Sequence, residues 1–440
     1  MDLPFADHKD LYATIDAIQQ GDIPWESFSV KYAGQLPETG PVHIWMTETF
    51  EVWFRSPLAV FEKQLVNPDF KDEMNWAPKR IFKNGKRQFI DLFSGNWVWE
   101  QADKIAADPE CHGAINTEFY PFYGGVGNSK EFRKFLAAAF PFIHCTNPPA
   151  IEAVYDEARC ADDHFRRAIY GLGPYIADYP EQALLTYIVQ GYCPRDSPRR
   201  CAEHTNALLA GCSTLKELWD DFGIVGDIIP FTADFPRADI HELISMDLLH
   251  QIIKGTFKDH IVDWIEEYIR ATNDNTEADR ILADIDRRIA ITPPFPGLRH
   301  FPVGRGFKQW TGNDSKGLMK VYLPAIAGHV PSQVVQMVAH IKEFCHLVRR
   351  SVIDKDTLLA IDATVNRFHQ TREIFRVIRP DGFSLPRQHS MVHYRPLIQA
   401  FGAPNGLCSS ITESKHIKAV KKLYRRQPFL AVSQLRAVCW

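Results

Sequence analysis

The sequence has 440 residues, of which 45% are hydrophobic, and its 50 Lys and Arg against 54 Asp and Glu give a net charge of −4. A chain of this length forms two or three domains, or one domain with a large insertion, and its apolar content excludes wholesale disorder. No run approaches the roughly 18 apolar residues of a membrane span, the start does not suit a secretory signal, and nine cysteines suggest reduced thiols. We therefore expect an intracellular protein without a membrane segment.

Residues 1–110 form a Trp-rich region of mixed pattern in which residues 80–92 predict a β-hairpin. Asn84-Gly85 supplies the pair of positive φ angles that a tight two-residue turn requires. The cations of this hairpin admit two interpretations: a ribbon that faces nucleic acid, or a charged edge that discourages sheet pairing. They lie around Phe82 and are Lys79, Arg80, Lys83, Lys86 and Arg87.

The remaining pattern is mainly helical, with strands in the minority and no internal repeat. A Pro-rich break at residues 293–296 separates two groups of predicted helices. The expected segments are helices at 7–20, 130–142, 247–269 and 277–289, a strand at 118–128, an apolar run at 183–189, and helical periodicity over 318–348 and 355–378.

Positive charge is concentrated at the C-terminal end. Residues 379–440 contain ten Lys and Arg against Asp381 and Glu413, a local balance of +8, which leaves −12 for the rest. A basic helix on an acidic body can bind DNA phosphates, although a solvated helix face explains the same pattern. The cations at roughly helical spacing after Glu413 are Lys415, Lys418, Lys421, Lys422, Arg425 and Arg426.

Three acids lie beside predicted chain reversals or helix starts. Asp178, in YIADYP, fits either a metal ligand or a turn cap. Asp247 and His250, in DLLH, share one helix face, and Asp247 fits a helix N-cap equally well. Glu413 suits either the first turn of the basic helix or a catalytic metal ligand among phosphate-binding cations.

The sequence does not predict a structural zinc site. Cys193, Cys201, His204 and Cys212 match no standard zinc spacing, and in CPRD Asp196 stands where a CxxC pair needs its second sulfur. We therefore expect free thiols here. P-loop, GxSxG and HExxH motifs are absent from the sequence.

Long stretches between residues 163 and 422 resemble Plavaka-type DNA transposases of basidiomycete fungi, which are related to the CACTA and Kyakuja-Dileera-Zisupton groups. The N-terminal WESFSVKYAGQLPETGPVHIWMTETFEVWFR also resembles this family. The other matching stretches include HFRRAIYGLGPYIADYPEQ, FPRADIHELISMDLLHQIIKGTFKDHIVDWIEEY, RPDGFSLPRQHSMVHY and FGAPNGLCSSITESKHIKAVK.

The resemblance implies an α/β (α+β), mainly helical fold: a ribonuclease-H-like core interrupted by a large helical insertion. Such cores use Asp, Asp and Glu to hold two Mg²⁺ or Mn²⁺ ions for cutting and joining DNA. Asp178 matches the family's second aspartate, Asp247 and His250 match its D-x-x-H signature, and Glu413 is the candidate final glutamate. The implied divisions are an N-terminal region at 1–110, the core at 111–260, the insertion at 261–386 and a closing segment at 387–440.

The chain departs from this family where the first catalytic aspartate is expected. Members carry a GSDKT-like strand shortly after the position of Ala114, whereas here INTEFYPFYGG follows directly. We expect a truncated or decayed transposase that lacks strand-transfer activity, with weak, non-specific DNA binding by the basic helix, nuclear localisation, and scope for a homo-oligomer. The alternatives are a domesticated, non-catalytic DNA- or chromatin-binding protein, and an active nuclease in which Asp162 or Asp163 replaces the missing acid.

Overall fold

The computed structural model describes most of the chain between residues 23 and 409, with gaps. The predicted segments at 7–20, 118–128 and 130–142 lie outside the described residues. The described residues are 23–24, 26–31, 36, 42, 46–72, 75, 77–107, 156–163, 165–168, 172–195, 211, 214–225, 232, 238–296, 298–306 and 310–409.

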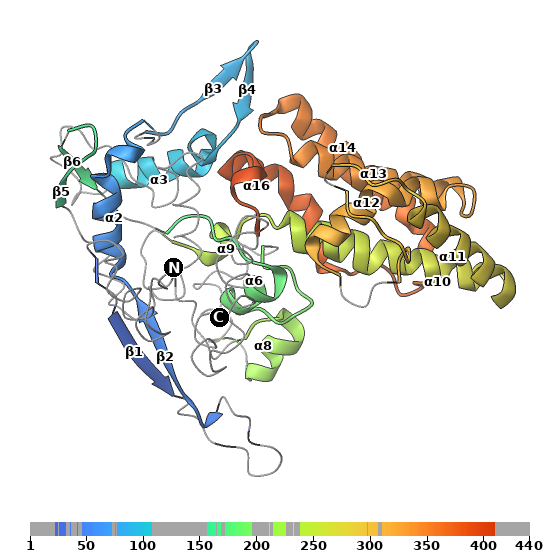
Figure 1. Cartoon of the computed structure of the whole chain (residues 1–440). Coiled ribbons are helices and arrows are strands. Elements are labelled where there is room, and N and C mark those ends of the chain that lie inside the picture. The colour runs from blue at the N-terminus through green and yellow to red at the C-terminus, as the bar shows by residue number, and fades with distance from the viewer. Residues whose placement is uncertain are drawn as a thin grey trace, which may run out of the picture.

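Helices dominate the described part and the strands form small sheets, which confirms the predicted mainly helical α+β class (Figure 1). The strands are β1 (Glu26–Lys31), β2 (Thr49–Phe54), β3 (Ile81–Lys83), β4 (Lys86–Phe89), β5 (Asp156–Arg159), β6 (Phe165–Ala168) and β7 (Ile353–Asp354). The helices before residue 248 are α2 (Pro57–Leu65), α3 (Asn96–Ala107), α6 (Tyr179–Leu185), α8 (Leu215–Phe222) and α9 (Ile240–Leu243). The later helices are η7 (Leu248–Val262), α10 (Asp263–Thr272), α11 (Asn275–Ala290), α12 (Gly312–Ile326), α13 (Ser332–Val348), α14 (Lys355–Thr371), η8 (Arg372–Val377), α15 (Pro386–His389), η9 (Ser390–His393) and α16 (Tyr394–Phe401).

The predicted hairpin is present as β3 and β4, which pair antiparallel. Asn84 and Gly85 have φ angles of 52° and 72°, the positive values that this two-residue turn needs. A third strand, β7, pairs with β4 through Gln88 opposite Asp354. The sheet order is therefore β3-β4-β7, with β4 as the central strand. The sheet thus joins segments that are far apart in the sequence. The other two sheets are the two-stranded pairs β1–β2 and β5–β6.

The predicted helix at 247–269 exists as two joined elements. Its first part, η7, is a π-helix whose last residue continues directly into α10. The region 318–348, by contrast, is not one continuous helix: α12 ends at Ile326 and α13 begins at Ser332. Pro331 at the start of α13 has no N–H to donate, which explains the break there.

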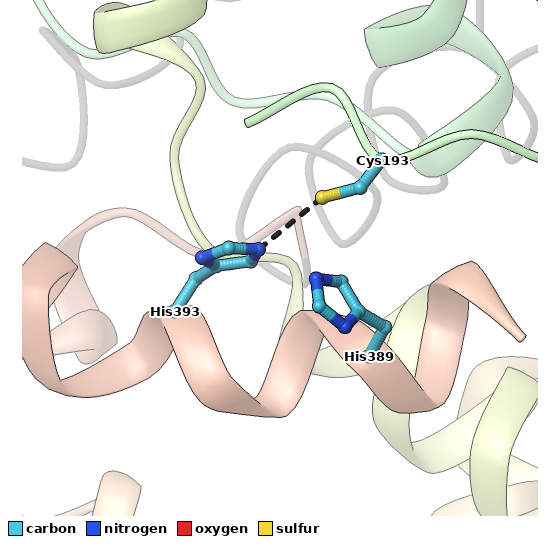
Figure 2. Close-up of side chains that lie close together, drawn as sticks. All are labelled: Cys193, His389 and His393. Atoms are coloured by element: carbon cyan, nitrogen blue, oxygen red, sulfur yellow. Dashed lines mark hydrogen bonds between the residues drawn. The ribbon is translucent and has the colours of Figure 1, made fainter. Parts of the chain in front are cut away.

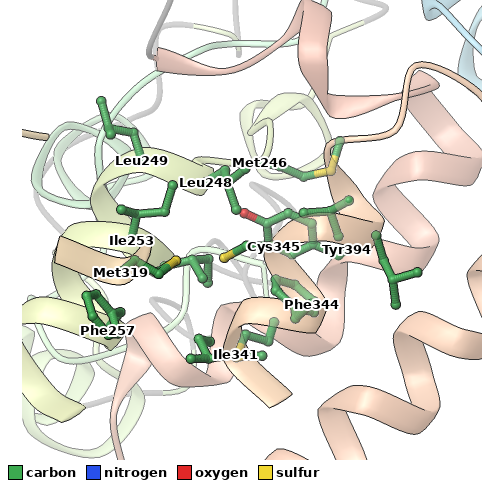
Figure 3. Close-up of a cluster of buried hydrophobic side chains, with 14 of the residues drawn as sticks. Met246, Leu248, Leu249, Ile253, Phe257, Met319, Ile341, Phe344, Cys345 and Tyr394 are labelled. Carbon is green, nitrogen blue, oxygen red and sulfur yellow. The ribbon is translucent and has the colours of Figure 1, made fainter. Parts of the chain in front are cut away.

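Helix η7 lies at the centre of the hydrophobic core. Ile252, Ile253 and Phe257 are fully buried, and η7 packs against α12 and α13 in one cluster of buried side chains (Figure 3). The rings of Phe257 and Tyr322 meet edge to face with their centroids 5.7 Å apart. Because these side chains are wholly removed from water, their burial holds η7 in the core. The residues that pack against η7 are held in place with it.

Within the described part of the chain, none of the helices combines the length and the apolar composition that crossing a bilayer requires. The ribonuclease-H-like core and the proposed domain divisions stay predictions. The described strands form sheets of two or three members, which do not establish such a core.

Candidate functional site

Asp178 caps a short helix. It is half-buried at the N-cap of α6, where its Oδ1 accepts a hydrogen bond from the backbone N–H of Glu181 at 3.1 Å. Glu181 is the nearest further acid along the chain, and the hydroxyl of Tyr175 donates to it at 2.8 Å. Burial, opposed by that hydrogen bond and reinforced by the charge of Asp178, raises the pKa of Glu181. The capping role considered from the sequence is thus present, and any role in metal binding stays a prediction.

Asp178 and Asp247 end two adjacent parallel segments. Tyr175 and Ile244 form a parallel bridge, in which the N–H of Tyr175 donates to Leu243 and the N–H of Ser245 donates to Tyr175. Each acid follows its bridge residue by three positions, so both lie beyond the same end of the pair.

The carboxylate of Asp247 is buried and already surrounded by hydrogen-bonding groups. It caps η7 by accepting from the backbone N–H of His250 at 3.2 Å, and its Oδ2 lies 3.0 Å from the His250 ring Nδ1. The Ser409 hydroxyl also donates to Asp247 Oδ1 and lies 3.2 Å from the same His250 Nδ1. This is not a hydrolase triad, because in a triad the serine and the acid face opposite nitrogens of the imidazole.

Several predicted site residues lie outside the described part of the chain. Glu413 and the basic residues between 415 and 426 are among them, although Ser409 brings the chain to within four residues of Glu413 beside Asp247. Asp162 and Asp163 are described, in the turn between β5 and β6. That hairpin lies beside α2, well apart from α6 in Figure 1, so these two acids do not join Asp178.

A second cluster combines one thiol with two imidazoles. Cys193, His389 and His393 each offer one donor atom, and the three atoms lie within 4.8 Å of one another (Figure 2). The Cys193 Sγ lies 3.2 Å from the His393 Nε2, and all three side chains are half-buried. Among the described residues, this is the group of three His, Cys, Asp or Glu side chains that could share a metal ion.

The loop that carries Cys193 is held on both sides. The Tyr179 hydroxyl donates to the Tyr192 carbonyl at 3.0 Å and accepts from the Gly191 N–H at 2.7 Å. The guanidinium of Arg195 donates to the carbonyl of Glu242 at 3.1 Å and to that of Ile244. The loop is thereby tied to the residue after Asp178 and to the segment that leads to Asp247.

The two histidines are placed by the close packing of α15 on η7. His389 and His393 are four residues apart on one continuous helical stretch, so they share a face. Gly255 of η7 allows the approach, since a Cβ there would lie 2.4 Å from Arg387 Cδ and 2.7 Å from the His250 carbonyl oxygen. Arg387 in turn donates to Asp259 at 2.9 Å.

The surroundings of Cys193 favour its thiolate. Burial raises the pKa of the thiol, but hydrogen bonds from His389 and His393 outweigh it and bring the value to about 6. A tetrahedral zinc ion, with Zn–S of about 2.3 Å and Zn–N of about 2.0 Å, holds sulfur and nitrogen about 3.5 Å apart. The observed separation of Sγ and Nε2 is close to this, so the donor set fits zinc.

Comparison with known proteins shows the family. The family model described as Plavaka transposase matches residues 5–119 and 148–265, which is more than half of the chain. The chain belongs to the Plavaka transposase family. Asp178, Asp247 and His250 lie within the second matched range, whereas Glu413 lies outside both. No curated protein matches the chain.

Membership of the Plavaka family makes this a transposon-derived, transposase-like protein, whose relatives act on DNA and generally depend on metal ions. The sequence analysis selected Asp178, Asp247 and His250, whose catalytic roles stay predictions, and it did not select His389, His393 or Ser409. The available signal was the pair of histidines at helical spacing in RQHSMVHY, about 200 residues from Cys193. Spacing around Cys193 alone could not reveal these partners.

Proposed function

We propose that this Plavaka-family protein keeps the DNA binding of a transposase but no longer cuts or joins DNA strands. The parallel bridge that brings the ends of the Asp178 and Asp247 segments together supports the proposal, because it places two of the family's predicted site residues beyond the same end of the paired segments. The chain lacks the GSDKT-like strand that would supply the first acid after Ala114. Two metal ions need carboxylates from several elements to offset their mutual repulsion.

The described acids do not fit a two-metal centre. Asp178 caps α6, and the buried carboxylate of Asp247 is engaged by His250 and Ser409. Asp178 and Glu413 would be the ligands in an active relative, with Mg²⁺ or Mn²⁺ supplying the charge that activates the attacking oxygen. We further propose a nuclear location, where DNA is available, and an origin in a basidiomycete fungus. A domesticated, non-catalytic DNA- or chromatin-binding role is the alternative form of the same proposal.

The test combines DNA retention with a cleavage assay on labelled duplexes in Mg²⁺ and Mn²⁺. We expect the protein to retain DNA and to leave it uncut. Asp178→Asn should therefore alter neither DNA retention nor the absence of cleavage, except through any loss of stability. Asp274→Asn is the matched control, because Asp274 caps α11 by the same hydrogen bond to an N–H three residues on, at 2.9 Å. Metal-dependent nicking that disappears in Asp178→Asn but not in Asp274→Asn would overturn the loss of activity. Failure to retain DNA would overturn the binding role.

We also propose that Cys193, His389 and His393 hold a structural zinc ion. The cluster joins the loop after α6 to the helical stretch of α15 and η9, so a bound ion would hold together two segments about 200 residues apart in the sequence. A fourth ligand is needed for tetrahedral coordination, and water or a carboxylate can supply it. Asp196, three residues after Cys193, is the candidate by sequence and lies outside the described residues.

A further inference from the structure

The β3–β4 hairpin presents two arginines on one face. Phe82 and Arg87 are directly opposite each other in the hairpin, and Arg80 is two residues before Phe82, so all three share a face. The Arg80 guanidinium lies 4.7 Å from the centre of the Trp99 ring, and that of Arg87 lies 4.9 Å from the centre of the Phe89 ring. Burial and then the charge of Arg80 lower the pKa of Arg87, which indicates that the two cations repel each other.

In the described part of the chain, acidic side chains pair with some of the hairpin cations but not with Arg80 or Arg87. Lys79 pairs with Asp91 at 2.9 Å, and Lys86 pairs with Asp356. Within the described residues, no acid forms an ion pair with Arg80, Lys83 or Arg87. Phe82, between the two arginines, is 61% exposed. The result is a positively charged, partly aromatic surface on a protein whose net charge is negative.

Protection of a sheet edge does not account for this arrangement. One charged side chain on an edge strand suffices to discourage pairing, and Lys83 on β3 meets that need. Arg87 lies on β4 directly before Gln88 and Phe89, which pair with β7, and its guanidinium lies over the Phe89 ring. Two neighbouring guanidinium groups without an acid are stabilised when an anion lies between them.

We infer that the hairpin surface of Arg80, Phe82 and Arg87 binds the phosphodiester backbone of duplex DNA, an inference that rests on the proposed DNA-binding function. Guanidinium groups match the paired oxygens of a phosphate, and the exposed Phe82 ring can lie against the apolar face of a sugar. The hairpin projects from the edge of the molecule next to α14, and a two-stranded ribbon fits a DNA groove (Figure 1).

The experiment measures binding of a duplex by the full chain over a range of salt concentrations. We expect Arg80→Gln with Arg87→Gln to weaken binding roughly 10- to 60-fold at 0.1 M salt and to flatten the log–log salt slope by about 2, taking about 0.9 per phosphate contact. The matched control, Lys71→Gln with Lys216→Gln, removes the same charge from exposed sites elsewhere and should leave the slope unchanged. Thermal melting of each variant shows whether the fold is intact.

Two further comparisons separate the outcomes. The loss should persist when Lys418, Lys421, Lys422 and Arg425 are already replaced by Ser, because the hairpin is a separate contact. Arg80→Lys with Arg87→Lys keeps the charge but removes the guanidinium geometry, so it should also weaken binding. Equal slopes for the hairpin variant and its control would overturn the inference while leaving the proposed function intact. If the parent chain retains no DNA, both the inference and the proposed function are wrong. If the hairpin variant loses more affinity for RNA than for DNA, the surface binds RNA instead.

Discussion

At the scale of single residues, the surroundings of Asp247 explain why its position in a family signature does not by itself make it a metal ligand. Its carboxylate faces the backbone N–H and the ring of His250 and the hydroxyl of Ser409. A buried carboxylate is tolerated only when such groups replace its hydration. These three groups use three of the roughly four acceptor positions of the carboxylate, which leaves room for at most one further contact.

The zinc proposal also belongs to this scale. We expect the purified protein to contain about one equivalent of zinc and to lose most of it in Cys193→Ser and His393→Ala, since each removes one ligand. In the cobalt-substituted protein, the thiolate charge-transfer absorption should disappear in Cys193→Ser. His346→Ala, at an exposed histidine of α13, is the control and should keep the metal. Equal metal content in all four proteins would show that the cluster is only a hydrogen-bonded thiolate–imidazole pair.

At the scale of elements, η7 connects the core to both candidate clusters. It begins at the Asp247 cap, contributes Phe257 to the core, and receives α15 at Gly255. A π-helix is wider than an α-helix and uncommon, and it occurs most often at functional sites. The position of His389 therefore depends on the shape of a helix that contributes no ligand to the zinc cluster.

Gly255→Ala tests this dependence. The added methyl group has to push α15 away from η7, which should lower the free energy of unfolding by about 1–3 kcal/mol and reduce zinc content. Gly406→Ala serves as the comparison, because no atom lies within 4 Å of its added Cβ and its φ is not positive. Denaturant unfolding of the two variants provides the measurement. If Gly255→Ala matches Gly406→Ala in stability and metal content, the contact with Arg387 does not hold α15 in place.

At the scale of the whole molecule, one hydrophobic core extends from α3 to α16. Trp97 and Phe401 meet edge to face with ring centroids 6.0 Å apart. Gly95 and Gly402 allow the two segments to come together, since a Cβ on Gly95 would lie 2.1 Å from the Ala400 carbonyl oxygen. The proposed insertion at 261–386 shares this core on both sides, because η7 precedes it and α16 follows it.

Limited proteolysis should reflect the shared core. We expect the resistant fragment to begin before Leu248 and to end after Phe401, since cleavage near residue 261 or 386 would separate buried side chains such as Phe257 and Tyr394 from their neighbours. Mass spectrometry of the fragments gives the boundaries directly. Early cuts at 261 and 386 that leave a stable piece between them would instead establish the insertion as an independent unit.

The sequence by itself determined what depends on local order: the hairpin turn at Asn84-Gly85, the long helices with their caps, the break after residue 290, and the family. Turn conformation, helical periodicity and capping involve residues only a few positions apart, so they can be predicted from the sequence. Glu413 and the basic helix stay predictions that lie outside the described residues.

The tertiary structure alone decided which distant side chains meet. His389 and His393 lie about 200 residues from Cys193, and Ser409 lies 162 from Asp247, so no spacing rule could join them. The same holds for β7, which pairs with Gln88 and Phe89 of β4 and so makes β4 the central strand of its sheet. These contacts follow from the packing of α15 and α16 on η7 and from the shared core, which depend on the shape of the whole chain.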